Sequence, residues 1–272
     1  MNADTFVDQL RIMAALEDSP ATDRVLQAFR AVPREAFAGA GPWKLRSPHE
    51  GFSLPIQKTP DADPKWLYNS VLIVLDEKKG INIGDPVFWS RRFVRANVAP
   101  GVRILQVGAG VGYYTAILSQ LVGSKGSVTA YEVEEGLAER ARKNLSEWPN
   151  VEVRYGNATT DLNSDDMFDL IVAFAGITHV PELWLSHLSP TAQLLVPLTG
   201  DNWWGAMVLA EKKDCGFDAV TLGRVGVYPC AGARDEALAK RISDLFCDPT
   251  RFTGFQMRLE AQGDTDRISL IA

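Results

Sequence analysis

The sequence Val102-Arg-Ile-Leu-Gln-Val-Gly-Ala-Gly-Val-Gly-Tyr-Tyr114 joins an apolar run to a glycine turn, and a helical pattern follows up to residue 122. This order predicts the first strand, loop and helix of a nucleotide-binding α/β unit. Gly108, Gly110 and Gly112 are spaced G-x-G-x-G, whereas the dinucleotide motif is G-x-G-x-x-G and holds a pyrophosphate. The tighter spacing favours a ligand without phosphate that presses against bare backbone, as S-adenosylmethionine does.

A second predicted strand, residues 127–133, ends beside an acidic side chain, Glu132. A carboxylate about 20 residues after the glycine loop can accept hydrogen bonds from both ribose hydroxyls of NAD or of S-adenosylmethionine. Further segments continue the alternation: a helix at 135–145, strands at 151–155 and 168–174, a short helix near 181–188 and a strand at 193–197. The pattern predicts an α/β fold, a doubly wound Rossmann-like sheet that binds ligands at the carboxyl ends of its strands.

Additional segments flank this core on both sides. Two amphipathic helices are expected near 5–16 and 22–31, and a long irregular stretch rich in proline and tryptophan then spans 33–86. A stretch of this kind inside a compact domain is usually a lid or a binding segment. After the core we expect strands at 204–210 and 219–228, a helix at 234–246 and a tail that forms a hairpin.

These elements divide the chain into three segments. We expect N-terminal helices and a substrate lid at 1–98, the cofactor-binding core at 99–210, and a strand, helix and tail at 211–272 that complete the same domain.

Composition narrows the function classes. A chain of 272 residues that is 46% apolar can bury a large core without disulfides. Its three cysteines lack C-x-x-C spacing, so neither a disulfide framework nor a metal site is expected. We find no apolar run near the roughly 18 residues of a membrane span and no signal pattern, and we therefore expect a cytoplasmic protein. The net charge of −6, with both signs interspersed, argues against nucleic acid binding. A homodimer is left open.

Longer motifs extend over roughly residues 24–230. Residues 24–37 end in V-P-R-E-A-F, residues 104–118 carry a tyrosine directly after the glycine loop, and residues 151–158 end in G-N-A. Residues 168–181 and 194–200 contain F-D-L-I-V-A and L-V-P-L-T-G. Together these resemble the protein-L-isoaspartate O-methyltransferase family of S-adenosylmethionine-dependent methyltransferases. The resemblance implies a methyltransferase sheet with an N-terminal helical and lid region, a C-terminal β/α extension, and S-adenosylmethionine as cofactor.

The resemblance also assigns the cofactor site. The glycine loop is expected to hold the methionine part, Glu132 the ribose, and Asn157 with Ala158 the adenine. The expected cofactor-binding residues are Gly108, Ala109, Gly110, Gly112, Tyr113, Glu132, Val133, Asn157 and Ala158. The family has acids where this chain has Gln106 and Asn157, although an amide oxygen can still pair with an adenine edge.

The acceptor segment departs further from the family. The family's segment G-Q-T-I-S-Q-P covers the cofactor, and its hydroxyls hold the isoaspartyl carboxylate; the best match here is Gly80-Ile-Asn-Ile-Gly-Asp-Pro86. Asn82 and Gly84 replace the threonine and the serine, so the hydroxyl expected to assist catalysis is missing. We expect residues 82–85 to form the wall between cofactor and acceptor. The chain is therefore interpreted as a divergent member with an altered acceptor, either a small molecule or a peptide that offers a carboxylate or hydroxyl.

The chemistry limits which residues are catalytic. Methyl transfer from a sulfonium needs no general acid, and a carboxylate acceptor is already ionised at pH 7. A phenol, alcohol or amine would need a base. His179, just past the strand at 168–174, is the best candidate base and is expected to face the same cavity as residues 82–85; His187 and His49 are weaker candidates. His179, Asn82 and Gly84 are thus the candidate catalytic positions.

Several functions stay open at this point. Tryptophans in or next to the lid and after the 193–197 strand favour an acceptor with an apolar body. Genuine isoaspartyl repair is the alternative within the family. A non-catalytic protein that binds S-adenosylmethionine is a second, and it is supported by the lost hydroxyls. An NAD-linked oxidoreductase is a third, which the G-x-G-x-G spacing disfavours.

Overall fold

The computed structural model describes residues 3–48, 55–214, 216–261 and 268–271. By its internal contacts the chain divides into two compact units. The first comprises Met1–Gly101, Ala109–Ser127 and Glu135–Val153, and the second comprises Val102–Gly108, Val128–Glu134 and Arg154–Ala272. The three segments expected from the sequence stay a prediction.

Most helices belong to the first unit. They are α1 (Ala3–Met13), α2 (Pro20–Ala31), α3 (Glu35–Ala38), α4 (Pro86–Ala96), α5 (Tyr113–Val122), the short turn η3 (Gly123–Lys125) and α6 (Glu135–Asn144). Helix α2 begins at Pro20 because the side chain of Ser19 accepts a hydrogen bond from the Thr22 N–H and caps the first turn. The apolar faces of α1 and α2 bury Phe6 and Phe29. Both helices expected at the N-terminus are therefore confirmed.

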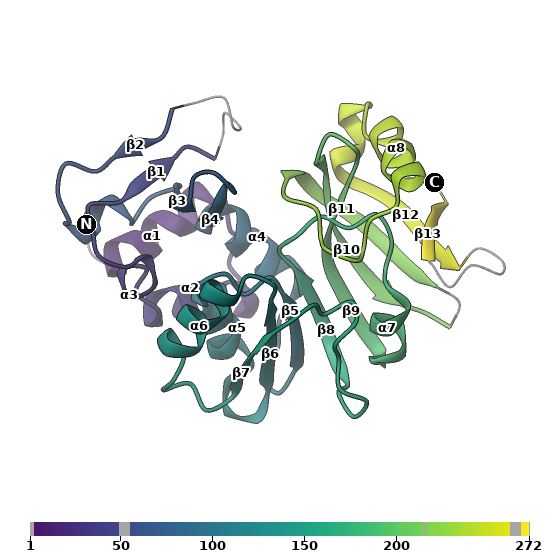
Figure 1. Cartoon of the computed structure of the whole chain (residues 1–272), viewed down its shortest axis with the longest axis horizontal. Coiled ribbons are helices and arrows are strands. Elements are labelled where there is room, and N and C mark those ends of the chain that lie inside the picture. The colour runs from purple at the N-terminus through teal and green to yellow at the C-terminus, as the bar shows by residue number, and fades with distance from the viewer. Residues whose placement is uncertain (1–2, 49–54, 215, 262–267, 272) are drawn as a thin grey trace. The chain divides into compact units, whose positions relative to one another are not determined.

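The stretch 33–86 was expected to be irregular, and this was wrong. It contains a four-stranded antiparallel sheet with the order β2-β1-β3-β4, together with α3 and the turn η2 (Pro64–Trp66) (Figure 1). The strands are β1 (Lys44–Arg46), β2 (Gln57–Lys58), β3 (Leu72–Asp76) and β4 (Ile81–Ile83). Three of the four strands have only two or three residues, which is too few to show a hydrophobic period and explains the error.

Helix α4 was also not predicted, although its start signals are in the sequence. The Asp85 carboxylate accepts hydrogen bonds from the N–H groups of Val87 and Phe88, and Pro86 occupies the first helical position. The helix ends where Asn97 takes a left-handed backbone conformation. The Asp-Pro pair of the acceptor segment therefore serves as a helix start.

A larger sheet carries the predicted nucleotide-binding pattern. Among the described residues its nine strands have the order β13-β12-β11-β10-β9-β8-β5-β6-β7. They are β5 (Arg103–Val107), β6 (Ser127–Glu132), β7 (Val151–Tyr155), β8 (Phe168–Ala173), β9 (Leu188–Thr199), β10 (Trp204–Lys212), β11 (Phe217–Gly226), β12 (Thr253–Ala261) and β13 (Ile268–Ile271). Strand β5 runs parallel to β8, and β8 parallel to β9. Chain order reverses on either side of β5, which is the switch point of a doubly wound sheet, and the predicted fold class is confirmed.

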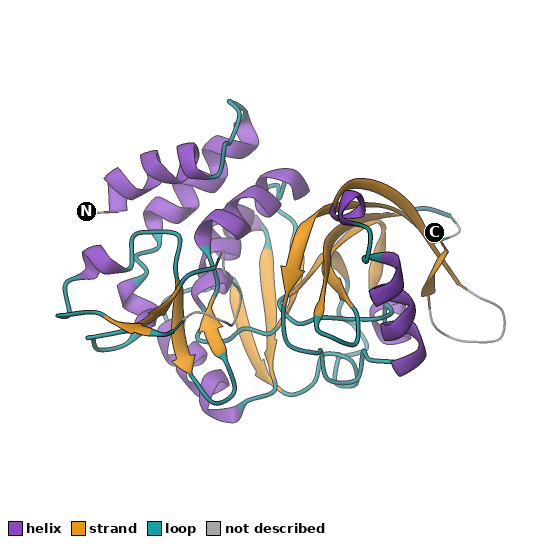
Figure 2. Cartoon of the chain, turned by 90° about the horizontal axis from the view of Figure 1, so that it is seen from above, coloured by secondary structure: helices purple, strands orange, loops and turns teal. Residues whose placement is uncertain are grey.

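The second half of this sheet is antiparallel. Strands β9 to β13 pair in chain order, and Figure 2 shows that the long strands of this half curve. Three helical segments, α7 (Glu182–Ser186), α8 (Glu236–Leu245) and η4 (Pro249–Phe252), interrupt the strands. This half forms the expected C-terminal β/α extension, and its tail forms the expected hairpin.

The core of the second unit lies on strands β8, β9 and β10. Ile171, Leu194 and Val208 are fully buried there, and so is Trp184 of α7. The Trp184 indole N–H donates to the Ala158 carbonyl oxygen at 2.9 Å, which satisfies its buried polar edge. This tryptophan is thus a core residue that fixes the loop after β7. Within the described ranges, no helix is long and apolar enough to cross a bilayer.

Candidate cofactor and acceptor sites

The glycine loop leaves β5 and enters α5. The N–H of Gly108 donates to the carbonyl oxygen of Tyr131 on β6 at 2.9 Å, which fixes the start of the loop. Gly110 and Gly112 have φ angles of 57° and 92°, which glycine adopts without steric cost. A Cβ on Gly112 would lie 2.6 Å from the side chain of Leu145, whereas a Cβ on Gly110 would meet no atom within 4 Å. Gly112 is therefore required by packing, and Gly110 leaves open space for a ligand.

Gln106 lies on β5, two residues before the loop. Its side chain is fully buried, and its amide N–H donates to the Gly108 carbonyl oxygen at 3.2 Å. Its amide oxygen is buried and has no hydrogen-bond partner in the described part of the chain. A buried acceptor costs free energy unless a donor reaches it. This acceptor in the second unit fits a ligand that carries an ammonium group, as S-adenosylmethionine does.

Tyr113 and Ala109 were also expected at the cofactor. The Tyr113 ring is buried, and it packs edge-on against Phe29 and Phe37, at 6.4 Å and 5.7 Å between ring centroids. Burial raises the pKa of its hydroxyl above the usual tyrosine value. The ring therefore belongs to the core of the first unit. Ala109 is likewise buried.

The predicted ribose residue lies at the end of β6. Glu132 is 6% exposed, and one of its carboxylate oxygens accepts the N–H of Glu134 at 3.0 Å. Its carbonyl oxygen accepts the N–H of Gly156, which joins this strand end to the loop after β7. The next residue, Val133, is 51% exposed. The second unit thus presents a carboxylate and an exposed apolar side chain at the place expected for the ribose.

The predicted adenine loop follows β7. The Asn157 amide oxygen accepts hydrogen bonds from the backbone N–H and the hydroxyl of Thr159, at 3.0 and 2.9 Å. These two bonds use both lone pairs of that oxygen. The Asn157 N–H donates to the Asp161 carboxylate at 2.6 Å, and Ala158 is buried. In this structure the Asn157 side chain shapes the loop, and an adenine edge would have to displace Thr159 to reach the amide oxygen.

The acceptor segment is fixed at Gly84, in the first unit. The Gly84 carbonyl oxygen accepts the Tyr114 hydroxyl at 2.8 Å and an Arg34 guanidinium N–H at 3.2 Å. A Cβ on Gly84 would lie 2.9 Å from the indole nitrogen of Trp89 and 3.2 Å from its Cδ1. Trp89 is buried on α4. A serine at position 84 therefore cannot be accommodated unless Trp89 moves.

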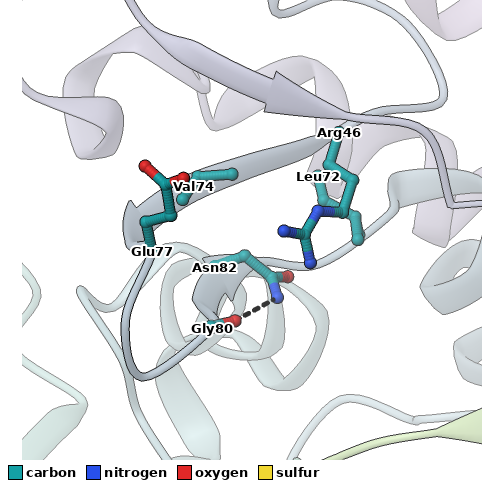
Figure 3. Close-up of a pocket in the computed structure, with 6 residues that line it drawn as sticks. All are labelled: Arg46, Leu72, Val74, Glu77, Gly80 and Asn82. Carbon is teal, nitrogen blue, oxygen red and sulfur yellow. Dashed lines mark hydrogen bonds between the residues drawn. The ribbon is translucent and has the colours of Figure 1, made fainter. Parts of the chain in front are cut away.

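Asn82 lies on β4, on the face of the small sheet opposite Ile73 and Ile83. Its side-chain N–H donates to the Gly80 carbonyl oxygen at 3.0 Å. Figure 3 shows the narrow hollow that its amide borders, with the guanidinium of Arg46 pointing into it. The hollow is lined by Arg46, Leu72, Val74, Glu77, Gly80 and Asn82.

The charges around this hollow are partly paired. The Lys44 ammonium group donates to the Glu77 carboxylate at 2.6 Å, and this bond lowers the pKa of that carboxyl. The Arg46 guanidinium and the Asn82 amide are donors of the kind that binds a carboxylate.

Arg34 was not identified as a site residue from the sequence, although the V-P-R-E motif contains it. Its side chain is fully buried and donates to the carbonyl oxygens of Leu67 at 2.6 Å, Asn69 at 3.2 Å and Val71 at 3.1 Å, as well as Gly84. Its guanidinium also lies over the Tyr113 ring, 5.6 Å from the centroid. Arg34 thus ties the acceptor segment to the start of α5.

The next motif residue, Glu35, accepts the Tyr68 hydroxyl at 2.5 Å. Burial, together with this bond, raises the pKa of Tyr68. The motif is therefore explained by packing of the first unit.

The histidines differ in their surroundings. His179 is 5% exposed, and its Nδ1 lies 3.1 Å from the Thr178 hydroxyl, which also accepts the Asp235 N–H at the start of α8. His179 belongs to the second unit and Asn82 to the first, so a shared cavity stays a prediction. The His187 ring nitrogens lie 2.7 and 3.1 Å from two backbone carbonyl oxygens, which indicates a structural role. His49 lies outside the described residues.

No metal centre is found in the ranges that the structure describes, where no three His, Cys, Asp or Glu side chains gather. Cys230 and Cys247 are free thiols, the first buried and the second exposed, and Cys215 lies outside the described residues. Burial raises the pKa of Cys230 to about 12.

Comparison with known proteins assigns the family. The model of the family protein-L-isoaspartate(D-aspartate) O-methyltransferase (PCMT) matches residues 7–227. Protein-L-isoaspartate O-methyltransferase 2 of Rhodopseudomonas palustris is 29% identical over 195 residues, which are 71% of this chain and 78% of the relative. A protein-L-isoaspartate O-methyltransferase of Pelotomaculum thermopropionicum is 30% identical over 214 residues, 77% of this chain and 81% of the relative.

Solved structures agree in fold. A protein-L-isoaspartate O-methyltransferase has a TM-score of 0.67 at 19% identity, covering 99% of this chain and 88% of its own. A Plasmodium falciparum structure in complex with S-adenosyl-L-homocysteine has a TM-score of 0.62 at 19% identity, and the match covers 85% of this chain and 98% of that structure's chain. The predicted resemblance is confirmed. The chain belongs to the protein-L-isoaspartate(D-aspartate) O-methyltransferase family and is an S-adenosylmethionine-dependent methyltransferase.

Proposed function

We propose that the chain methylates a carboxylate of a peptide or small-molecule acceptor through an acceptor site that differs from the family's isoaspartyl site. The observation that carries this proposal is the contact between Gly84 and Trp89. The indole lies 2.9 Å from the point where a Cβ at position 84 would be. The loss of the family's serine is therefore matched by a large side chain in its place, which supports a rebuilt site rather than a simple loss.

In this proposal, different residues bind different parts of the cofactor. When bound, the cofactor supplies a methyl group on a sulfonium sulfur, whose leaving group departs neutral. Gly110 allows the ligand to approach the backbone closely. The space that a side chain would occupy there is empty, so the ligand can fill it. The Glu132 carboxylate at the end of β6 holds the ribose hydroxyls, and the Gln106 amide oxygen accepts a hydrogen bond from the ammonium group. These residues orient the methyl group and supply no proton transfer.

A carboxylate acceptor suits the residues around the acceptor segment. An ionised carboxylate attacks without a base, and His179 is buried and hydrogen-bonded to Thr178. The Arg46 guanidinium and the Asn82 amide, which border the acceptor segment, are groups of the kind that binds an anion. The contribution of the enzyme is then orientation and exclusion of water.

The names of the relatives favour a second candidate, genuine isoaspartyl repair. A panel of acceptors separates the two: an isoaspartyl peptide, the same peptide with a normal aspartyl residue, small carboxylic acids and a phenol, each with radiolabelled S-adenosylmethionine. Carboxyl methyl esters release methanol in base, whereas methyl ethers do not. We expect base-labile label on carboxylates other than the isoaspartyl one. Label on the isoaspartyl peptide alone supports repair, base-stable label refutes a carboxylate acceptor, and no label on any acceptor refutes the proposed acceptor class.

The contact at Gly84 can be tested directly by substitution. Restoring the family's hydroxyls with Asn82→Thr and Gly84→Ser should not raise isoaspartyl methylation, because the serine side chain would collide with Trp89. The same pair combined with Trp89→Leu should raise isoaspartyl methylation by about tenfold, the value of one hydrogen bond of about 1.4 kcal/mol. Trp89→Leu alone is the control. A gain in the double variant that still contains Trp89 would show that the indole does not block the site.

His179→Gln tests the need for a base. With a carboxylate acceptor the rate should fall by less than the roughly 10²–10⁴-fold attributed to a general base, whereas a hydroxyl acceptor should lose that full factor.

A cytoplasmic location and a homodimer stay predictions.

A further inference from the structure

Trp203 occupies a strained position in the turn between β9 and β10. Its φ is 66°, in the left-handed region that bulky side chains rarely adopt, and 44% of the residue is exposed. Glycine or asparagine would hold this backbone at lower cost. The stability of the turn therefore does not explain a tryptophan here, and strain of this kind is characteristic of functional positions.

Surrounding hydrogen bonds impose the strained backbone. The Trp203 N–H donates to the Gly200 carbonyl oxygen at 3.2 Å, and the Trp203 carbonyl oxygen accepts the Val227 N–H at 3.2 Å. Arg234 donates to the Gly200 carbonyl oxygen at 2.7 Å. The Trp203 ring lies 5.5 Å from the Tyr228 ring, tilted by 51°. The turn is thus built to hold two aromatic rings together at the surface.

The pair lies at the ligand-binding edge of the sheet in the second unit. Because β8 and β9 are parallel, the turn after β9 shares an edge with the loop after β8. The Tyr228 carbonyl oxygen accepts the Gly176 N–H of that loop at 2.7 Å. Three residues further along, the Ala231 carbonyl oxygen accepts the Thr159 hydroxyl beside Asn157. One short segment therefore leads from the aromatic pair to the predicted adenine loop.

We propose that Trp203 and Tyr228 form a platform at the ligand-binding edge of the second unit's sheet, and that this platform binds an apolar side chain of the acceptor. This inference rests on the proposed function, and it names the acceptor as a peptide or molecule with an apolar group beside its carboxylate. Stacking on the exposed Trp203 ring and the half-buried Tyr228 ring favours an aromatic or large aliphatic group. Two side chains are too small a surface for a stable subunit interface, which buries about 800 Å² on each partner. Trp204 is not part of the platform, because its ring is covered by the Arg224 guanidinium at 4.3 Å.

Trp203→Gly distinguishes a role in acceptor binding from a role in stability, because the first predicts a loss of activity and the second a loss of stability. The variant removes the strain, so its urea unfolding midpoint should equal or exceed that of the parent. Its kcat/KM should fall about 3- to 10-fold for the best peptide of the panel with phenylalanine beside the carboxylate. The fall should be smaller for the same peptide with alanine there. Ala15→Gly, which relieves a φ of 46° elsewhere, is the matched control and should change only the midpoint.

Three results would overturn the platform. The first is a lower midpoint with unchanged kcat/KM, since Trp203 would then be structural. The second is an equal loss for the phenylalanine and alanine peptides. The third is a change of oligomeric state in sedimentation of Trp203→Gly, which would assign the pair to a contact between copies.

Failure of the proposed function is detected separately, by the parent enzyme on the acceptor panel. If it methylates no peptide, binding of the phenylalanine and alanine peptides is measured calorimetrically with S-adenosylhomocysteine present. Weaker binding of the phenylalanine peptide to Trp203→Gly supports the platform. Equal binding, or no binding to either protein, refutes it.

Discussion

Replacing Arg34 by methionine should strongly destabilise the chain and loosen the acceptor segment. The guanidinium is fully buried and donates to four carbonyl oxygens, at 2.6, 3.2, 3.1 and 3.2 Å. A hydrogen bond from a charged donor contributes about 1.5–3 kcal/mol net, so simple addition would give about 6–12 kcal/mol. The sum is too large, because burying the charge has its own cost and the four bonds are not independent.

A better guide is the loss of one partner from a buried charged network, about 3–5 kcal/mol. This is a large share of the 5–15 kcal/mol that typically separates folded from unfolded chains. Urea unfolding followed by circular dichroism should therefore show a lower midpoint with an unchanged m-value. Arg34→Lys keeps the charge but lacks the planar fork, and we expect an intermediate loss.

Arg30→Met is the matched control. Arg30 is about half exposed and pairs with Asp4, so its replacement should cost less than about 1 kcal/mol. A loss below about 1 kcal/mol for Arg34→Met would refute the view that Arg34 holds the acceptor segment in place. An unchanged midpoint with a lower kcat would instead place Arg34 in the chemistry.

Three further predictions concern other parts of the chain. Gly112→Ala should lower the free energy of unfolding by about 1–3 kcal/mol through strain and overpacking. Gly110→Ala should chiefly weaken the binding of S-adenosylhomocysteine, measured by calorimetry. A larger loss of stability for Gly110→Ala and a larger loss of binding for Gly112→Ala would refute the roles given to the two glycines. The hydrogen bond from Arg103 lowers the pKa of Asp169, so the ionised carboxyl stabilises the fold fully above its ordinary pKa and loses this effect as the pH falls through the lowered value. Asp169→Asn should thus cost up to about 1 kcal/mol at pH 7, with a difference from the parent that shrinks below about pH 4 in urea titrations; a constant difference would contradict this. Cys230, with its pKa raised to about 12, should resist iodoacetamide at pH 8 in the folded chain and react after unfolding, and rapid labelling of the folded chain would show that it is accessible.

The sequence alone determined the nucleotide-binding half of the fold. The apolar run 102–107, the glycine spacing and the helical period that follows are local patterns, and the structure has β5, the loop and α5 at those positions. Successive strands and helices were equally readable, since each carries its own period over at least five residues. The family motifs predicted the cofactor for the same reason. A glycine turn is specified by a few adjacent residues.

The tertiary structure decided the acceptor side. Arg34 gathers carbonyl oxygens from residues 33 to 50 positions further along the chain, and the sequence has no periodic signal for such a partner. The sequence showed that Gly84 lacks a hydroxyl, and only the structure showed that Trp89 takes the space. The small sheet also depends on tertiary structure, because strands of two or three residues are stabilised by pairing with other segments rather than by their own pattern. Local periodicity specifies an element, but the contacts that shape a binding site depend on where segments remote in sequence meet.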